Sequence, residues 1–350
     1  MADKEKRSKI TYADSGVDIK AGQQAVEKMK RLVAETFNDQ VLSGLGAFGG
    51  FFKPKLGAVK QPVFLSSTDS VGTKLKLAFM TNRHNTMGED LVNHCVNDIL
   101  VHGARALFFL DYIGIHKVDP DMAAELVSGL SRGCKNNGVA LIGGETAELT
   151  DLYHPGEYDL VGFVVGIVDE NHIVNGSTIK EGDICLGLTS SGLHTNGYTL
   201  ARKAAFEIAG HKPDDYVDEL QMTIAEALMQ VHRSYATLIH PLLDKFDIHG
   251  MAHITGGGVA GNLVRVLPEG VEAVIDKKSW PVPAIFQYLQ RVGDIDPYDI
   301  YSAFNMGIGY VIVVSPGIAD DVTADLEKAG EKVYRIGEIR KGDKAVRLVD

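Results

Sequence analysis

The stretch Ser-Ser-Thr-Asp-Ser-Val-Gly-Thr-Lys occupies residues 66–74 and directly follows the apolar run Val-Phe-Leu at residues 63–65. An apolar run that ends in polar residues predicts a strand followed by a turn. In this turn Asp69 can bind a metal ion, Gly72 lets a ligand approach the backbone, Thr73 offers a hydroxyl and Lys74 a positive charge. We interpret the stretch as a phosphate-binding turn; a plain polar turn between two strands is the alternative.

The stretch is not a P-loop. Walker A requires Gly-x-x-x-x-Gly-Lys-Ser/Thr, whereas Thr73 precedes Lys74 here and no glycine lies five residues before Gly72. Any phosphate site at this turn therefore belongs to another class.

Length and charge narrow the function further. A chain of 350 residues predicts two domains, and 46 acidic against 35 basic side chains give a net charge of −11. This charge argues against nucleic acid or an anionic membrane as a partner, and it requires a cation wherever phosphate is bound. The three cysteines form no C-x-x-C, the N-terminus is charged, and the apolar runs are short, so we expect buried thiols in a cytoplasmic protein.

Two segments match Gly-x-Gly-x-x-Gly, at residues 44–49 and 256–261. The first follows a predicted helix at residues 21–37, which excludes a Rossmann context. We expect a flap that closes on a ligand through Gly46, Phe48, Gly49 and Gly50; a flexible loop is the alternative. The second precedes a short helix, so Gly256, Gly257 and Gly258 are expected to face substrate or to pack against the first domain.

The remaining pattern predicts alternating strands and helices, with a linker near residue 172 that divides residues 1–171 from residues 172–350. Asp98 lies on the apolar side of a helix at residues 89–102, where a salt bridge or a metal ion must compensate its charge. A strand at residues 139–142 is expected to end before Gly143-Gly144-Glu145. Residues 220–246 predict a helical segment broken at Pro241.

The second half begins with a strand at residues 184–189, the loop Ser-Ser-Gly-Leu-His-Thr-Asn-Gly at residues 190–197, and a helix from Tyr198. A strand, a hydroxyl-rich loop and a helix N-terminus together indicate an anion site. His194 would there be protonated and act on substrate, or it is an ordinary loop histidine.

Residues 68–74, Asn97-Asp98, residues 143–148, residues 190–197 and residues 255–258 together resemble the phosphoribosylformylglycinamidine cyclo-ligase family, in order and over most of the chain. The resemblance implies an α/β fold of two domains. It further implies an N-terminal domain that binds ATP and pairs its sheet across a homodimer into a β-barrel, and a C-terminal substrate domain built as a mixed sheet with flanking helices. The Gln-Val-His-Arg-Ser-Tyr segment at residues 230–235 departs from the family pattern.

The resemblance also implies site residues and cofactors. ATP and Mg²⁺ are expected, and a requirement for K⁺ stays open. Asp69, Asp98 and Glu145 would hold the metal, and Asp69, Lys74 and His194 would be catalytic. The nucleotide would contact Gly46, Phe48, Gly49, Gly50, Gly72, Thr73, Lys74 and Asn97. The ribonucleotide would contact Ser190, Ser191, His194, Thr195, Asn196, Gly256, Gly257 and Gly258.

Other ATP-using enzymes remain as alternatives. Thiamine monophosphate kinase and the glycinamidine-forming synthetase are disfavoured by residues 190–197, although fold alone would not exclude them. Selenophosphate synthetase would need a reactive cysteine before Asp69, and this chain has none there. A nucleotide-binding dimer without catalytic activity would have lost acidic residues such as Asp69, Asp98 and Glu145, which are present here.

Overall fold

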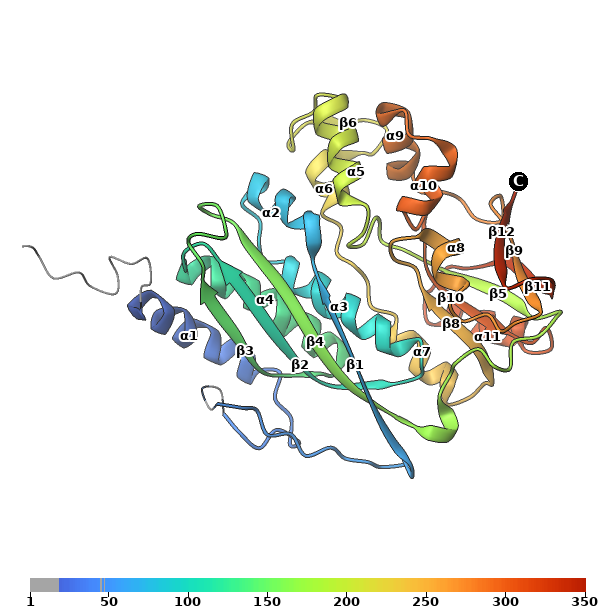
Figure 1. Ribbon diagram of the computed structural model, residues 1–350, viewed down its shortest axis with the longest axis horizontal. Helices are drawn as coiled ribbons and strands as arrows, with labels where there is room; N and C mark the ends of the chain where they lie inside the picture. Colours follow the sequence, from blue (N-terminus) through green and yellow to red (C-terminus); the bar gives the residue numbers. More distant parts are fainter. Residues whose placement is uncertain (1–18, 45, 47) are drawn as a thin grey trace, which may run out of the picture.

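The computed structural model describes residues 19–44, 46 and 48–350. Its strands form two large sheets that lie beside each other, one from each half of the chain (Figure 1). The first sheet has the strand order β1-β4-β2-β3 and the second β12-β9-β11-β5-β10-β8. Both sheets mix parallel and antiparallel neighbours, which confirms the predicted α/β class.

The first half contains α1 (Ile19–Ala34), β1 (Pro62–Ser70), the short 3-10 turn η2 (Gly72–Lys74), α2 (Leu75–Thr81), α3 (Met87–Leu100), β2 (Arg105–Ile115), α4 (Pro120–Asn137), β3 (Ala140–Glu148), β4 (Tyr158–Asp169) and η3 (Glu170–His172). The second half contains β5 (Ile184–Thr189), α5 (Tyr198–Arg202), the π-helical η4 (Lys203–Ile208), β6 (Tyr216–Val217), β7 (Met222–Thr223), α6 (Ile224–Leu228), α7 (Ala236–Leu243), β8 (Ile248–His253), α8 (Gly258–Leu263), β9 (Val271–Asp276), α9 (Ala284–Gly293), α10 (Pro297–Ala303), β10 (Ile308–Val314), α11 (Ala319–Lys328), β11 (Val333–Lys341) and β12 (Ala345–Val349).

The helices α3 and α4 pack on one face of the first sheet (Figure 1). The predicted apolar side of α3 is confirmed, because its members Leu91, Val92, Cys95, Val96 and Ile99 are all buried. The helix α4 begins where the Asp119 carboxylate accepts the N–H groups of residues 121 and 122, and it ends at Gly138 in the left-handed conformation. The three cysteines are free and buried, as the sequence predicts.

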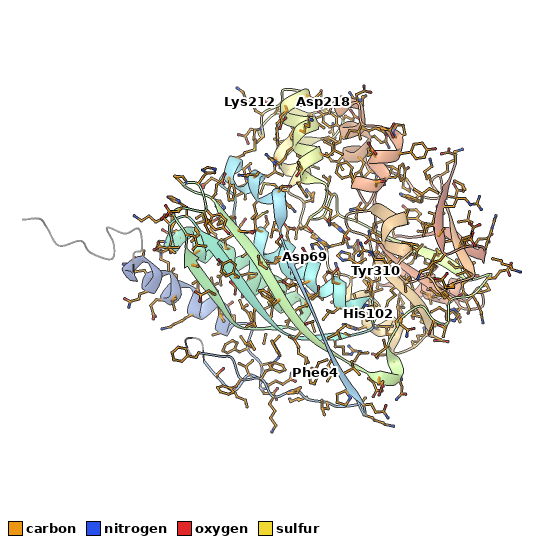
Figure 2. The ribbon with its side chains drawn as sticks, viewed as in Figure 1. Phe64, Asp69, His102, Lys212, Asp218 and Tyr310 are labelled. Atoms are coloured by element: carbon orange, nitrogen blue, oxygen red, sulfur yellow. The ribbon has the colours of Figure 1, made fainter. Side chains whose placement is uncertain are left out.

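The opposite face of the first sheet carries exposed aromatic side chains. Phe64 on β1 and Phe163 on β4 share this face and keep 55% and 42% of their surface exposed. Figure 2 shows Phe64 toward one end of β1 and Asp69 toward the other. Large apolar side chains exposed together on a sheet face are a feature of binding surfaces.

Two predicted elements are wrong. The strand expected to end at residue 142 continues to Glu148, because residues 143–148 pair in parallel with residues 110–115 of β2. The helical segment expected over residues 220–246 is interrupted at residues 229–235, before α7, whereas Pro241 lies inside α7. We call residues 229–235 the crossing segment.

Polar side chains of α3 hold the crossing segment in place. Asp90 accepts the N–H of His232 at 2.7 Å, and Asn93 donates to the carbonyl of His232 at 2.6 Å. Asn97 donates to the carbonyl of Arg233 at 2.9 Å and accepts the N–H of Tyr235 at 3.0 Å. Residues spaced by three and four share one side of a helix. The helix α3 therefore has an apolar side against its sheet and a polar side against the second half.

A buried ion pair completes this contact. The Lys74 ammonium lies 2.8 Å from the Asp90 carboxylate, and both side chains are fully buried. Lys74 also donates to the carbonyl of Gln230 at 2.7 Å. Burial lowers the pKa of Lys74 and raises that of Asp90, and each partner opposes the shift of the other. The prediction that Lys74 neutralises phosphate does not fit this arrangement, because its charge is already paired away from the surface.

We predict strong coupling between Lys74 and Asp90. Lys74→Met and Asp90→Asn should each lower the free energy of unfolding by about 3–5 kcal/mol, because each leaves one buried charge unpaired. The double variant should lose clearly less than the sum, since no buried charge remains and the introduced amide keeps an oxygen that can accept the N–H of His232. Urea unfolding of the four proteins measures the coupling.

The matched control is the exposed pair Lys28 and Asp121. Lys28→Met and Asp121→Asn should change stability by no more than about 1 kcal/mol, singly or together. Additive losses at Lys74 and Asp90 would show that the buried pair is not coupled.

Candidate functional site

The three acids predicted to hold a metal ion do not meet within one chain. Asp69 lies opposite Gly162 on β4, Gly162 lies opposite Asp111 on β2, and Asp111 lies opposite Gly144 on β3. Glu145 is therefore three strand spacings, about 14 Å, from Asp69. Of the three, only Asp69 and Asp98 lie on the side of the sheet that α3 covers, where Ser67 on β1 donates to Asp98 at 3.1 Å.

Two histidines contact these two acids instead. His94 Nε2 lies 2.8 Å from Asp69 Oδ2, and His253 Nδ1 lies 2.8 Å from Asp98 Oδ1. Neither histidine was predicted as a site residue. One signal was present, because His94 stands four residues before Asp98 and thus shares its side of α3. No local pattern marks His253, which comes from the last residue of β8.

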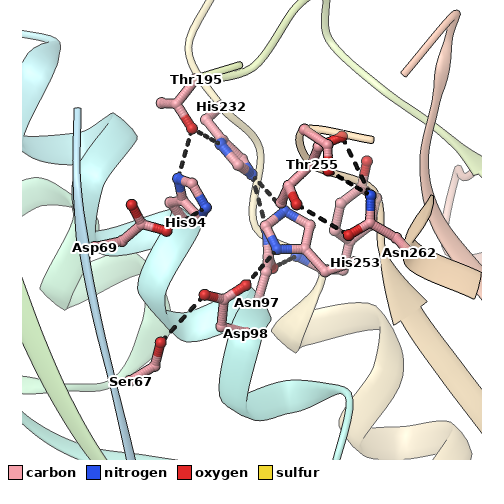
Figure 3. A network of polar contacts seen from close by, with 12 residues as sticks. Ser67, Asp69, His94, Asn97, Asp98, Thr195, His232, His253, Thr255 and Asn262 are labelled. Atoms are coloured by element: carbon pink, nitrogen blue, oxygen red, sulfur yellow. Dashed lines mark hydrogen bonds and ion pairs between the residues drawn. The ribbon is translucent and has the colours of Figure 1, made fainter. Parts of the chain in front are cut away.

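Further contacts join the two pairs across the molecule, as Figure 3 shows. Thr195 Oγ1 lies 2.6 Å from His94 Nδ1 and 3.2 Å from His232 Nδ1. His232 Nε2 lies 3.0 Å from His253 Nε2. A continuous polar path thus runs from Asp69 to Asp98, through residues of both halves of the chain. We call Asp69, His94, Thr195, His232, His253 and Asp98 the histidine network.

The imidazole rings of the network differ in their pKa, which is raised in His94 and lowered in His232 and His253. Burial disfavours a charged His94, but the hydrogen bond and charge of Asp69 outweigh it and raise the pKa of the imidazole. Burial lowers the pKa of His253, and burial lowers that of His232 well below its ordinary range. The pKa of Asp98 is lowered, because the contacts with His253 outweigh its burial. At neutral pH Asp98 is therefore ionised, and His232 and His253 are neutral.

His194 is placed differently from the prediction. Its side chain is fully buried, its backbone is left-handed with φ 62°, and its ring stacks on His232 at 4.1 Å. The N–H of Ser191 donates to its Nε2 at 3.2 Å. Burial lowers the pKa of His194 well below its ordinary range. The prediction of a protonated ring at the mouth of a helix N-terminus does not fit this buried ring with its lowered pKa.

The neighbouring loop residues make contacts within the protein. Ser190 donates to Asn305 at 2.9 Å and Ser191 to the carbonyl of Val231 at 2.5 Å. Asn97, predicted to contact nucleotide, is buried and occupied by the crossing segment. The predicted contact between Asn97 and the nucleotide therefore does not fit the structure.

Other predicted residues do come together. Gly72 and Thr73 are exposed, and the Thr73 hydroxyl lies 3.0 Å from that of Thr199 on α5. The phosphate-binding turn of the first half thus touches the loop-helix junction of the second. Gly256 lies beside Asn196, since an added Cβ would stand 3.4 Å from the Asn196 amide oxygen.

Packing accounts for one glycine of the second glycine-rich loop. Gly258 has φ 61°, and a Cβ there would stand 1.8 Å from the carbonyl oxygen of Tyr301. Gly257 also has a positive φ, of 99°, but it is exposed. Gly256 and Gly257 thus remain available to a ligand, whereas Gly258 is required by the fold.

The flap (residues 44–52) borders a cavity of about 820 Å³ between α1, β2 and β3. Gly46, Phe48, Gly49 and Gly50 all line it, and Glu145 lines it from β3. The base of the flap is fixed, because Leu42 donates to the carbonyl of Phe51 at 2.9 Å and Phe52 packs on Phe108.

Asp111 is a further carboxyl group in this cavity. Burial raises its pKa to about 7.

None of the helices in the described part of the chain is long and apolar enough to cross a membrane.

Known proteins resemble the whole chain. Residues 57–168 match the family described as AIR synthase related protein, N-terminal domain, and residues 180–350 match its C-terminal domain. A phosphoribosylformylglycinamidine cyclo-ligase of Alkaliphilus oremlandii is 47% identical over 97% of this chain and 100% of its own length. One of Pseudothermotoga lettingae is 49% identical over 96% and 99%. The chain belongs to the phosphoribosylformylglycinamidine cyclo-ligase family.

Solved structures share the fold at lower identity. A thiamine-monophosphate kinase from Stenotrophomonas maltophilia K279a superposes with a TM-score of 0.66 at 18% identity, over 93% of this chain and 95% of that one. The hydrogenase maturation protein HypE, solved in complex with ATP, gives 0.68 at 17%, over 96% and 93%. These likenesses show that the chain shares its fold with both proteins.

The buried rings predict a pH dependence of stability. The folded chain keeps His194 neutral, whereas the unfolded chain binds a proton below a pH of about 6.5. Stability is therefore present above that pH and is lost as the pH falls, by about 1.4 kcal/mol per pH unit for each such group. Urea unfolding between pH 7 and pH 5 measures how the free energy of unfolding changes with pH. In His194→Asn this change should be smaller by about 1.4 kcal/mol per pH unit, because the titrating ring is absent. Asparagine is chosen because it tolerates the left-handed backbone.

The control is the exposed His154. His154→Asn should keep the slope of the unchanged protein. Equal slopes in all three proteins would show that His194 is protonated equally in the folded and unfolded states.

Proposed function

We propose that this protein catalyses the ATP-dependent cyclisation of formylglycinamidine ribonucleotide to aminoimidazole ribonucleotide, with release of ADP and phosphate, in purine biosynthesis. Membership of the cyclo-ligase family over nearly the full chain is the observation that supports it. An amide oxygen is a poor leaving group. Phosphoryl transfer from ATP to the formyl oxygen makes phosphate the leaving group, and a nitrogen of the amidine then attacks that carbon to close the ring.

We assign the nucleotide to the cavity beneath the flap. Its volume of about 820 Å³ is adequate for a nucleotide, and its lining glycines allow close contact between backbone and ligand. The flap would close over the bound nucleotide. The HypE structure named for its complex with ATP supports a nucleotide site on this architecture.

We assign the phosphates and the ribonucleotide to the contact between the two halves. Gly72 and Thr73 are exposed there, and the loop containing Ser191 and Asn196 lies next to the exposed Gly256 and Gly257. Free backbone groups and hydroxyls suit phosphate oxygens. Thr195 and His194 would support this loop from within and would not contact the substrate.

A divalent cation belongs beside Asp69 and Asp98. Two like charges 4 Å apart repel by about 4 kcal/mol at an effective dielectric constant of 20. These carboxylates could not face a triphosphate without a cation between them. Asp69 and Asp98 fit this role, with Mg²⁺ supplied as MgATP, and the cation would stabilise charge on the phosphoryl group. Glu145 faces the nucleotide cavity instead.

Three finer assignments stay proposals. Residues 1–171 form the ATP-binding and dimerisation domain, and residues 172–350 form the substrate domain. The protein acts in the cytoplasm. A potassium requirement stays open and is tested by assay in sodium against potassium buffers.

We predict that Asp69→Asn lowers the rate of cyclisation at saturating substrates by about 100-fold or more, because one charged group near the phosphates is lost. Formation of aminoimidazole ribonucleotide from formylglycinamidine ribonucleotide and MgATP measures this rate. Asp320→Asn, an exposed change in the first turn of α11, should leave it unaltered.

Thermal unfolding of the same variants separates function from folding. A folded Asp69→Asn protein with full activity would remove Asp69 from the reaction. Absence of product from the unchanged protein would refute the proposed activity itself.

We further propose a homodimer formed through the exposed face of the first sheet. Phe64 and Phe163 lie on this face and keep 55% and 42% of their surface exposed. A second copy would bury these side chains, and two four-stranded sheets facing each other give the barrel that the family resemblance implies.

We predict that sedimentation gives about twice the chain mass of 37.9 kDa. Phe163→Asp should shift the protein to monomer, because a charge would be buried in an apolar interface. Tyr298→Asp, an exposed aromatic change on α10, should remain dimeric. A monomer of the unchanged protein at micromolar concentration would refute the dimer.

A further inference from the structure

We propose that Asp69, His94, Asp98 and His253 form a binding site for a divalent transition metal, with zinc as the best-suited ion. This inference deepens the proposed function and rests on it in one respect, because Asp69 and Asp98 are the carboxylates assigned above to the cation of the reaction. The two histidines make the site different from an all-oxygen magnesium site.

The ligand atoms are close enough to share one ion. His94, Asp98 and His253 each offer an atom within 4.8 Å of the others. Each imidazole nitrogen lies 2.8 Å from a carboxylate oxygen, His94 from Asp69 and His253 from Asp98. Ligand atoms about 2.0–2.1 Å from a tetrahedral zinc ion lie about 3.3 Å apart, so these three atoms would draw together on binding. Asp69, which contacts His94, would turn toward the ion to become the fourth ligand.

The outer atoms of these ligands are already held. Thr195 contacts the second nitrogen of His94 at 2.6 Å, and His232 contacts that of His253 at 3.0 Å. Ser67 donates to the second oxygen of Asp98 at 3.1 Å. Partners of this kind fix the tautomer and direction of metal-binding imidazoles in known metal sites. They leave His94 Nε2 and His253 Nδ1 directed at the two carboxylates.

The donor set selects the class of metal. Mg²⁺ prefers oxygen ligands in octahedral geometry and retains several waters. Imidazole favours zinc and other first-row transition metals, and two carboxylates balance the charge of a divalent ion. Two nitrogens and two oxygens therefore favour zinc over magnesium in the absence of nucleotide.

A second group of histidines is less suitable. His194, His232 and His253 also offer atoms within 4.8 Å of one another. However, the rings of His194 and His232 stack with planes only 16° apart. Lone pairs in two nearly parallel planes do not converge on one ion, so His232 is better placed as an orienting group.

Metal binding would connect the two halves of the chain. Asp69 comes from β1 and His94 and Asp98 from α3, whereas His253 comes from β8. An ion bound by residues from both halves stabilises the folded arrangement by mass action, in addition to any part in catalysis.

Isothermal titration of the chelator-treated full-length protein with Zn²⁺, and separately with Mg²⁺, tests the proposal without nucleotide. We expect one Zn²⁺ per chain, bound at least about 100-fold more tightly than Mg²⁺. Co²⁺ should give the visible absorption of a four-coordinate ion. His94→Gln and His253→Gln should each weaken Zn²⁺ binding by at least about 100-fold. His154→Gln, at an exposed histidine, should leave binding unchanged.

Circular dichroism establishes that each variant is folded before titration. Zinc bound no more tightly than magnesium overturns the proposal, as does zinc binding that persists unchanged in both His94→Gln and His253→Gln. The cyclisation assay with MgATP on the same preparations is a separate measurement. Its failure would count against the proposed function, whereas the zinc titration would still decide the site.

Discussion

The contact between α3 and the crossing segment is the constraint on which the rest of the structure depends. Asp90, Asn93 and Asn97 supply hydrogen bonds that an irregular backbone in the interior would otherwise lack. Without these partners, residues 229–235 would carry unsatisfied polar groups at a cost of about 1–3 kcal/mol each. The same contact brings His232 beside His253 and Thr195. The geometry of the site therefore depends on the hydrogen bonds that side chains of α3 make to the backbone of the crossing segment.

Much of the fold could be predicted from local sequence, because apolar periodicity reports burial. The apolar side of α3 and the end of α4 at Gly138 required only residues close in sequence. The extension of β3 through Gly143 and Gly144 could not be predicted, because parallel pairing with β2 supplies its hydrogen bonds and the glycines themselves are poor strand formers. The crossing segment was missed for a related reason, since its Tyr235 pairs with a side chain 138 positions away in the sequence.

The site was predicted less well than the fold, and the causes are specific. Asp69 and Asp98 lie at the two ends of one network of polar contacts, whereas Glu145 was joined to them without knowledge of the strand order. That order places β4 and β2 between β1 and β3. Lys74 and His194 have the residue types of a phosphate site, yet both side chains are fully buried. Residue type indicates the chemistry available, whereas strand order and burial decide which groups can reach a ligand.

Charge balance connects these observations. Asp69 and Asp98 lie at the two ends of the histidine network in a protein with a net charge of −11, and among the described residues their ion-pair partners are imidazoles. His94 can neutralise Asp69 as a cation, whereas His253, whose pKa burial lowers, gives Asp98 a hydrogen bond but no full charge. One negative charge thus remains beside a neutral ring. An ion bound there would balance this residual charge, and it would need the imidazoles beside the carboxylates in their unprotonated form, because only a free nitrogen lone pair can bind a metal.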